Sequence, residues 1–301
     1  MTVYRIKILL ILLLISDLTY GQAGVDTTKY KKYCVQNNCT LKPDNPSHFD
    51  PYYNGHLCEN FNPEQIDFSK EYLQLRVRSY PQDSNKLNQT LKYDFSPIWL
   101  TGNWVQNGVL GLNCQRIQFH IDKVIKSKTS AETYIVTGKS KVNNTICDFK
   151  GELQLRSVFL FTTCDYSDHK NCGGLFANYT FYEDSSQNHS GVFKGITECS
   201  FYLDMVTNTV QLDESSSVAD GYWNRSFVGT WTDYKTTKIK KCIWGDYRLP
   251  FTFDFDCGDG EMHVCDKYVK NGWQTFEDGS EYINLGNDKS EIKNKWWLTK
   301  K

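Results

Sequence analysis

Apolar and polar side chains alternate along much of the chain, and this alternation is the strongest pattern in the sequence. In the segment CDFKGELQLR, residues 147–156, apolar or small side chains occupy every second position and polar ones the positions between them. Successive side chains of a β-strand point to opposite faces, so the pattern predicts a strand with one buried and one wet face. The residues predicted to point inward are Cys147, Phe149, Gly151, Leu153 and Leu155.

The same alternation in other segments predicts a fold made mostly of antiparallel strands. The segments are RIQFHID (116–122), GLFANYTFYED (174–184), CSFYLDMV (199–206) and FTFDFDC (251–257). Turn-forming residues separate them, which suits consecutive hairpins. Residues 62–78 could form two or three helical turns, although a strand fits their second half equally well. We therefore predict an all-β protein, an antiparallel up-and-down barrel or a sandwich, stapled by disulfides and with few short helices.

The N-terminus has the layout of a secretory signal peptide. Arg5 and Lys7 precede an apolar run from Ile8 to Ile15, and small residues at Gly21 and Ala23 offer cleavage sites. A membrane anchor is the alternative, but a span needs roughly 20 apolar residues. We predict a secreted or extracytoplasmic protein without a transmembrane segment. Its predicted parts are a signal peptide (1–21), a Cys-containing, loop-rich lead-in (22–95), an antiparallel β body (96–236) and a Cys-containing β-hairpin tail (237–301).

Eleven cysteines, all beyond the predicted signal peptide, indicate disulfides formed in an oxidising compartment. Zinc is the alternative, but no C-x2-C pair is present. The predicted loop-closing pairs are Cys164 with Cys172, across a hairpin, and Cys34 with Cys39. A hairpin turning at Gly258–Gly260 would set Cys257 opposite Glu261, so Cys257 and Cys265 are expected to pair elsewhere, with Cys242 as one candidate. Because the number of cysteines is odd, at least one is expected to remain a free thiol or to form a disulfide with another chain.

Charge and composition exclude some partners. The formal net charge is −1, which gives no long-range attraction to nucleic acid or to an anionic membrane. Six N-x-S/T sequons occur, which would be glycan acceptors in a protein that passes through an endoplasmic reticulum and would mean nothing in a bacterial one. Their asparagines are Asn38, Asn88, Asn143, Asn178, Asn188 and Asn224.

The densest polar cluster, DFDCGDGEMH, offers four carboxylates around a Gly-rich turn: Asp254, Asp256, Asp259 and Glu261. Converging oxygens could hold Ca²⁺, although the spacing does not match an EF-hand loop. The alternative is an acidic, solvated hairpin tip. No other cofactor is predicted, because phosphate-binding Gly loops and zinc-type histidine spacings are absent from the sequence.

Two short segments, LTGNW (100–104) and FVGTW (227–231), both place a glycine two residues before a tryptophan. A glycine in a strand lets a neighbouring strand or ring approach, and the tryptophan then fills the volume from the same face. The segments resemble the Gly-x-Trp of calycin-type barrels, the lipocalin and avidin class. The resemblance implies an up-and-down barrel whose first-strand tryptophan, here Trp104, plugs one end. The alternative is two unrelated strands that each need a small residue beside a large one.

The leading functional prediction is a non-enzymatic binding or interaction protein outside the cell, holding a small apolar ligand, a glycan or a partner protein. The aromatic side chains predicted to bind are Trp104, Trp231, Trp244, Tyr247 and Trp273. One alternative is a carbohydrate-active hydrolase with paired carboxylates, drawn from Glu183, Asp184, Asp204, Asp254 and Asp256. The other is a structural or matrix component with no discrete site. Catalytic residues cannot be assigned from the sequence.

Overall fold

The computed structural model of the chain describes residues 67–80, 85–111, 113–164, 171–204, 206–286 and 289–299. Strands dominate this part of the chain, as predicted. The strands are β1 (Gln106–Leu110), β2 (Gln115–Lys126), β3 (Thr133–Val142), β4 (Thr145–Leu160), β5 (Cys172–Glu183), β6 (Gly191–Asp204), β7 (Thr209–Leu212), β8 (Trp223–Asp233), β9 (Ile239–Tyr247), β10 (Tyr282–Gly286) and β11 (Lys289–Ile292).

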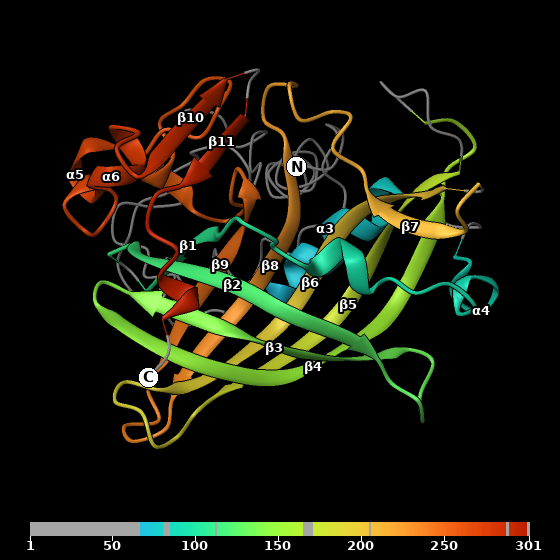
Figure 1. Ribbon diagram of the computed structural model, residues 1–301, viewed down its shortest axis with the longest axis horizontal. Helices are drawn as coiled ribbons and strands as arrows, with labels where there is room; N and C mark the ends of the chain where they lie inside the picture. The colour runs from blue at the N-terminus through green and yellow to red at the C-terminus, as the bar shows by residue number, and fades with distance from the viewer. Residues whose placement is uncertain are drawn as a thin grey trace, which may run out of the picture.

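Eight of these strands form a closed antiparallel barrel (Figure 1). Going around the barrel, their order is β1-β2-β3-β4-β5-β6-β8-β9, and the ring closes where β9 pairs with β1. Neighbours in the ring are therefore neighbours in sequence, apart from the short β7, which pairs with β6 at its edge. The fold is the up-and-down barrel, rather than the sandwich, of the two predicted architectures.

The predicted alternation places side chains as expected. On β4, Cys147, Phe149, Leu153 and Leu155 are buried, while the charged residues between them are mostly exposed. After Leu155 a bulge against β5 shifts the register, and Val158 takes the next inward position. Asn178 on β5 is exposed, as predicted for the outer face.

Aromatic side chains fill the middle of the barrel. Trp244 is 0% exposed and stacks on Phe119 at 4.0 Å and on Phe227 at 4.7 Å between ring centroids. At the barrel end where β3 begins, the short helix η3 (Ser96–Trp99) lies across the opening, and Trp99 contacts Tyr134 edge-on at 5.1 Å. This end is therefore closed by the segment that leads into β1.

The outside of the barrel carries most of the remaining helices and a two-stranded sheet of β10 and β11 (Figure 1). Helix α3 (Ser69–Ser79) forms most of the second half of residues 62–78, where a strand fits the sequence equally well, and it contacts β6 and β8. The other helices are all short: α4 (Leu87–Thr90), η4 (Phe253–Phe255), α5 (Asp266–Val269), α6 (Gln274–Glu277) and η5 (Trp296–Leu298).

The two Gly-x-Trp segments have different structures, so the prediction of one device used twice is wrong for the first copy. Gly229 lies on β8 opposite Gly195 of β6, and a Cβ built on it would be 2.7 Å from the Gly195 Cα. Gly102 lies in a turn with φ of +62° and has nothing within 4 Å of such a Cβ. A glycine is favoured at position 102 because the backbone there is left-handed, and not because a neighbouring strand approaches it closely. Trp104 stacks on Tyr282 outside the barrel, at 5.2 Å, and does not plug its end.

Residues 251–257, predicted as a strand, contain the helix η4 instead. The turn that follows is also longer than predicted, because Asp256 bridges Val264 and the Cys257 amide donates to the His263 carbonyl at 2.7 Å. Cys257 and Cys265 consequently come together as a disulfide with Cα atoms 5.2 Å apart, and the expectation that they pair elsewhere is wrong.

Cys164 and Cys172 form the disulfide expected across the β4–β5 connection, with Cα atoms 5.7 Å apart. The predicted signal peptide and the Cys34–Cys39 pair lie outside the described residues. In the part of the chain that the structure describes, every helix is too short or too polar to cross a lipid bilayer.

Candidate functional site

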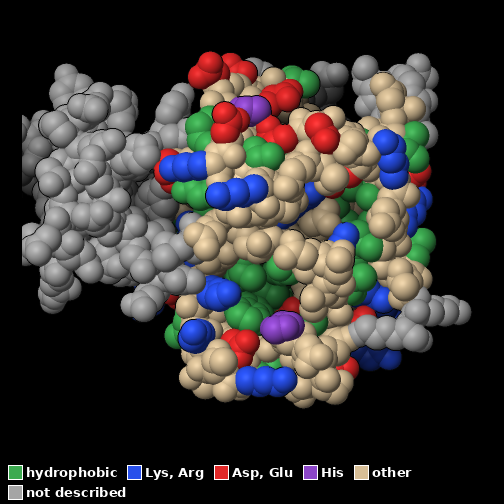
Figure 2. Space-filling view, turned by 90° about the vertical axis from the view of Figure 1, so that its left-hand side faces the viewer, with side chains coloured by type: hydrophobic (Ala, Val, Ile, Leu, Met, Phe, Trp, Pro, Cys, Tyr) green, Lys and Arg blue, Asp and Glu red, His purple; other side chains and the backbone are tan. Residues whose placement is uncertain are grey.

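A cavity of about 370 Å³ opens at the barrel end opposite η3. All eight barrel strands contribute to it: Leu110 (β1), Ile117 (β2), Ser140 (β3), Cys147 (β4), Glu183 (β5), Phe193 (β6), Trp231 (β8) and Lys240 (β9). The view onto this end shows hydrophobic side chains in a hollow ringed by charged and polar ones (Figure 2). The mouth of the barrel is therefore a concave surface whose shape depends on ring closure.

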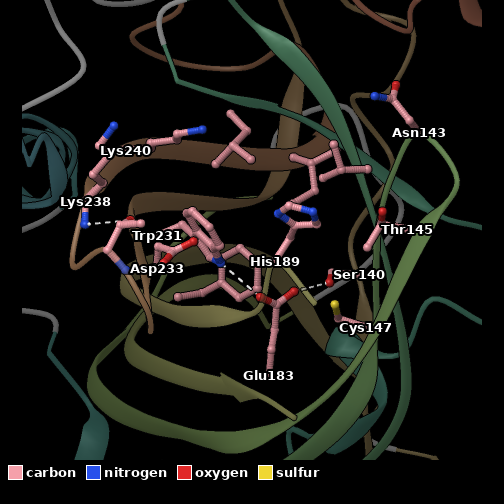
Figure 3. Close-up of a pocket in the computed structure, with 15 residues that line it drawn as sticks. Ser140, Asn143, Thr145, Cys147, Glu183, His189, Trp231, Asp233, Lys238 and Lys240 are labelled. Atoms are coloured by element: carbon pink, nitrogen blue, oxygen red, sulfur yellow. Dashed lines mark hydrogen bonds between the residues drawn. The ribbon is translucent and has the colours of Figure 1, made fainter. Parts of the chain in front are cut away.

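Walls and rim of the cavity differ in chemistry. Phe193 and Trp231 give the walls an aromatic character, together with aliphatic side chains from β1, β2 and β3. Lys238 and Lys240 stand on one side of the rim (Figure 3), and the Lys240 ammonium lies 5.8 Å from the Trp231 ring. His189, from the β5–β6 turn, also lines the cavity. An apolar interior with cations at its rim fits a mainly apolar molecule that has a polar end.

Glu183 is the buried carboxylate of the cavity, and it ties four strands together. Its Oε1 accepts a hydrogen bond from the Ser140 hydroxyl on β3. Its Oε2 accepts the Gly191 amide of β6 at 2.8 Å and the Trp231 indole N–H of β8 at 2.9 Å. Figure 3 shows the Ser140 and Trp231 bonds. Glu183 therefore fixes the orientation of the one tryptophan that the cavity presents.

Burial raises the pKa of Glu183 above its usual range, although the bonds from Ser140, Trp231 and Gly191 oppose the rise. A raised folded-state pKa means that the folded protein binds this proton more readily than the unfolded chain. The resulting stability is present at low pH and is lost as the pH rises from about 4.3, the unfolded value, through the folded pKa.

Replacing Glu183 with glutamine is expected to leave the protein at least as stable as wild type at pH 7.5. The amide oxygen can accept from Gly191 and Trp231, while the amide nitrogen donates to Ser140 with no charge to bury. Urea unfolding between pH 4 and pH 8 measures this, and the advantage of Glu183→Gln should shrink as the pH falls. Glu183→Ala is the control, expected to lose about 1–3 kcal/mol because three buried donors lose their acceptor. A Glu183→Gln protein less stable than wild type at pH 7.5 would contradict the assignment.

The structure does not bring the five predicted aromatic side chains together. Trp231 lines the cavity. Trp244 and Trp273 are both 0% exposed, the first inside the barrel and the second outside it, where its indole N–H donates to the Cys114 carbonyl. Trp104 packs on Tyr282, and Tyr247 is 43% exposed beside Glu214.

The four carboxylates of the predicted Ca²⁺ site also do not form one cluster. Asp254 accepts from the Tyr268 hydroxyl and pairs with Lys267. Asp256 is buried and pairs with Arg248 at 3.2 Å. Asp259 and Glu261 are exposed. Over the described ranges, no three His, Cys, Asp or Glu side chains lie close enough together to hold a metal ion.

Sequence reasoning identified several cavity residues without connecting them. Glu183 is one of the five carboxylates considered for hydrolysis, and Trp231 is one of the five aromatic side chains predicted to bind. The usable signal is their position, since each lies within a few residues of a turn at the same end of the barrel. Once the strand order is known, every second connection between barrel strands can be assigned to the same end of the barrel. The connections β1–β2, β3–β4, β5–β6 and β8–β9 lie at the end where the cavity opens.

The fold and the cavity define a closed, eight-stranded, up-and-down β-barrel with an open, partly apolar mouth. Comparison with models of known protein families, with curated proteins and with solved structures finds no match to this chain.

Proposed function

We propose that this protein is an extracytoplasmic binding protein that holds a small, mainly apolar molecule in the mouth of its barrel. The observation that carries the proposal is the cavity, whose volume of about 370 Å³ lies in the range of ligand sites, roughly 300–1,000 Å³. The resemblance to calycin-type barrels supports the same function. Two disulfides support an oxidising, extracytoplasmic location.

The filled interior limits the size of the ligand. Stacked rings of Phe119, Trp244 and Phe227 occupy the middle of the barrel, so a ligand enters only the space above Phe193. A molecule of one to three rings, or a short alkyl chain, matches the volume. Its polar end would face Lys238 and Lys240 at the rim.

Binding of 1-anilinonaphthalene-8-sulfonate, an apolar fluorophore with one anionic group, tests the proposal. We expect saturable binding to the folded protein. Val142→Trp should weaken it by about tenfold or more, because Val142 lines the cavity and the larger ring occupies ligand volume. Ile135→Trp is the matched control, since Ile135 lies on the same strand and is 47% exposed. Equal affinity of the two folded variants, or no binding by wild type, would contradict a ligand site at the mouth.

A further inference from the structure

The described sequon asparagines fall into two groups by exposure. Five of the six lie in the described part of the chain, and Asn224 alone among these five is buried, at 2% exposure. The exposed four are Asn88, Asn143, Asn178 and Asn188. Exposure is what a bulky hydrophilic glycan requires in the folded protein.

Two of the exposed asparagines stand at the mouth of the barrel. Asn143 occupies the β3–β4 turn, lines the cavity and points away from its centre (Figure 3). Its Oδ1 accepts from the Gln115 side chain at 3.2 Å, which turns Nδ2 away from that contact. Asn188 is in the β5–β6 turn, directly before the cavity residue His189. Both residues therefore lie in hairpin turns at the open end of the barrel.

The Asn224 side chain is fully engaged inside the fold. Its Nδ2 donates to the Asp213 carbonyl at 2.8 Å and to the Tyr222 hydroxyl at 3.0 Å. Its Oδ1 accepts from the Ser200 amide at 2.9 Å. A sugar on Nδ2 would replace one of these donated hydrogens and would need volume that the packed side chains occupy.

We propose that Asn143 and Asn188 carry N-linked oligosaccharides and that Asn224 does not. The donor is an oligosaccharide joined to a lipid diphosphate. One N–H bond of Asn Nδ2 breaks and a bond from Nδ2 to the anomeric carbon of the first sugar forms. The lipid diphosphate leaves with the electrons of the anomeric C–O bond, and the amide proton passes to a base.

Glycans at these two positions narrow the entrance of the cavity and restrict it to small molecules. This consequence rests on the proposed ligand-binding function, whereas the occupancy of the two asparagines does not. The outer-wall residue Asn178 provides a comparison, because it lies on the exposed face of β5 and does not line the cavity.

Occupancy is tested on the full chain, expressed with its own N-terminal segment in insect cells and collected from the medium. Peptide-N-glycosidase in heavy-oxygen water converts each occupied asparagine to a labelled aspartate, which peptide mass spectrometry locates. We expect label at Asn143 and Asn188 and none at Asn224. An unlabelled Asn143 or Asn188, a labelled Asn224, or failure of the chain to reach the medium would overturn the proposal.

The narrowed entrance is tested by stopped-flow binding of 1-anilinonaphthalene-8-sulfonate. Asn188→Gln should raise the association rate about twofold or more, and Asn178→Gln should leave it unchanged. Equal rates for the two variants would overturn the narrowing but not the occupancy. Absence of probe binding in every variant would instead contradict the proposed function, and the mass measurement would still decide the occupancy.

Discussion

Replacing Gly229 with alanine is expected to lower the free energy of unfolding by about 3 kcal/mol or more. The added Cβ would overlap the Lys194 carbonyl oxygen and lie 2.7 Å from both the Gly195 Cα and the Tyr179 hydroxyl oxygen. Two of these three neighbours are backbone atoms of β6, so the clash can be relieved only by separating β6 from β8. Urea unfolding monitored by circular dichroism measures the loss.

Gly102→Ala is the matched control for this prediction. Its Cβ meets nothing within 4 Å, so the cost is limited to the left-handed backbone, about 1–2 kcal/mol. A large difference between the two variants would show that the two Gly-x-Trp segments use glycine for different reasons. Equal losses would contradict the close approach of β6 and β8 at Gly229.

Replacing Glu198 with alanine is expected to cost about 3–5 kcal/mol. Glu198 is 4% exposed on the outer face of β6, where it accepts from the Tyr72 hydroxyl at 2.5 Å and the Tyr80 hydroxyl at 2.6 Å. Arg76 adds a two-pronged contact, with Nη2 at 2.7 Å. Removal of the carboxylate takes this ion pair from Arg76 and this acceptor from both hydroxyls, so the polar contacts that join α3 and Tyr80 to Glu198 of β6 are lost.

Lys194→Ala, an exposed change on the same strand, is the control and should alter stability by less than about 0.5 kcal/mol. Burial alone would raise the pKa of Glu198, but the Arg76 charge and the hydrogen bonds from Arg76, Tyr72 and Tyr80 hold it below its usual range. The stability from this group is present above about pH 4.3 and is lost as the pH falls through the folded pKa. Acid unfolding as steep in Glu198→Gln as in wild type would contradict the network.

Much of the fold follows from local pattern. The inward positions of β4 and β5 can be assigned from alternation alone, because a period of two admits only one choice of buried face. The Cys164–Cys172 disulfide also follows from the strand pattern. The two cysteines lie at either end of the connection between β4 and β5, and these strands pair with each other. The choice between barrel and sandwich does not follow, because it depends on whether β9 meets β1.

The errors occur where long-range contacts decide the local conformation. FTFDFDC alternates like a strand, yet the Phe255 ring packs at a tilt against Trp273, with ring centroids 4.9 Å apart and outside any sheet. Asp256 is buried by pairing with Arg248, so the sequence rule that places aspartate in solvent fails there. The cavity was inaccessible to sequence reasoning for a related reason. Its residues come from every strand of the ring, and no spacing along the chain brings them together.

Pairing of Asn107 on β1 with Gly245 on β9 has a consequence for how the nascent chain matures. The hairpins from β2 to β6 join consecutive segments and can form while the ribosome is still translating the rest. β1 and β8 keep unpaired edges until β9 emerges, and such edges readily recruit other chains. A chain truncated before Ile239, where β9 begins, would therefore be prone to aggregation and would not form a smaller soluble barrel.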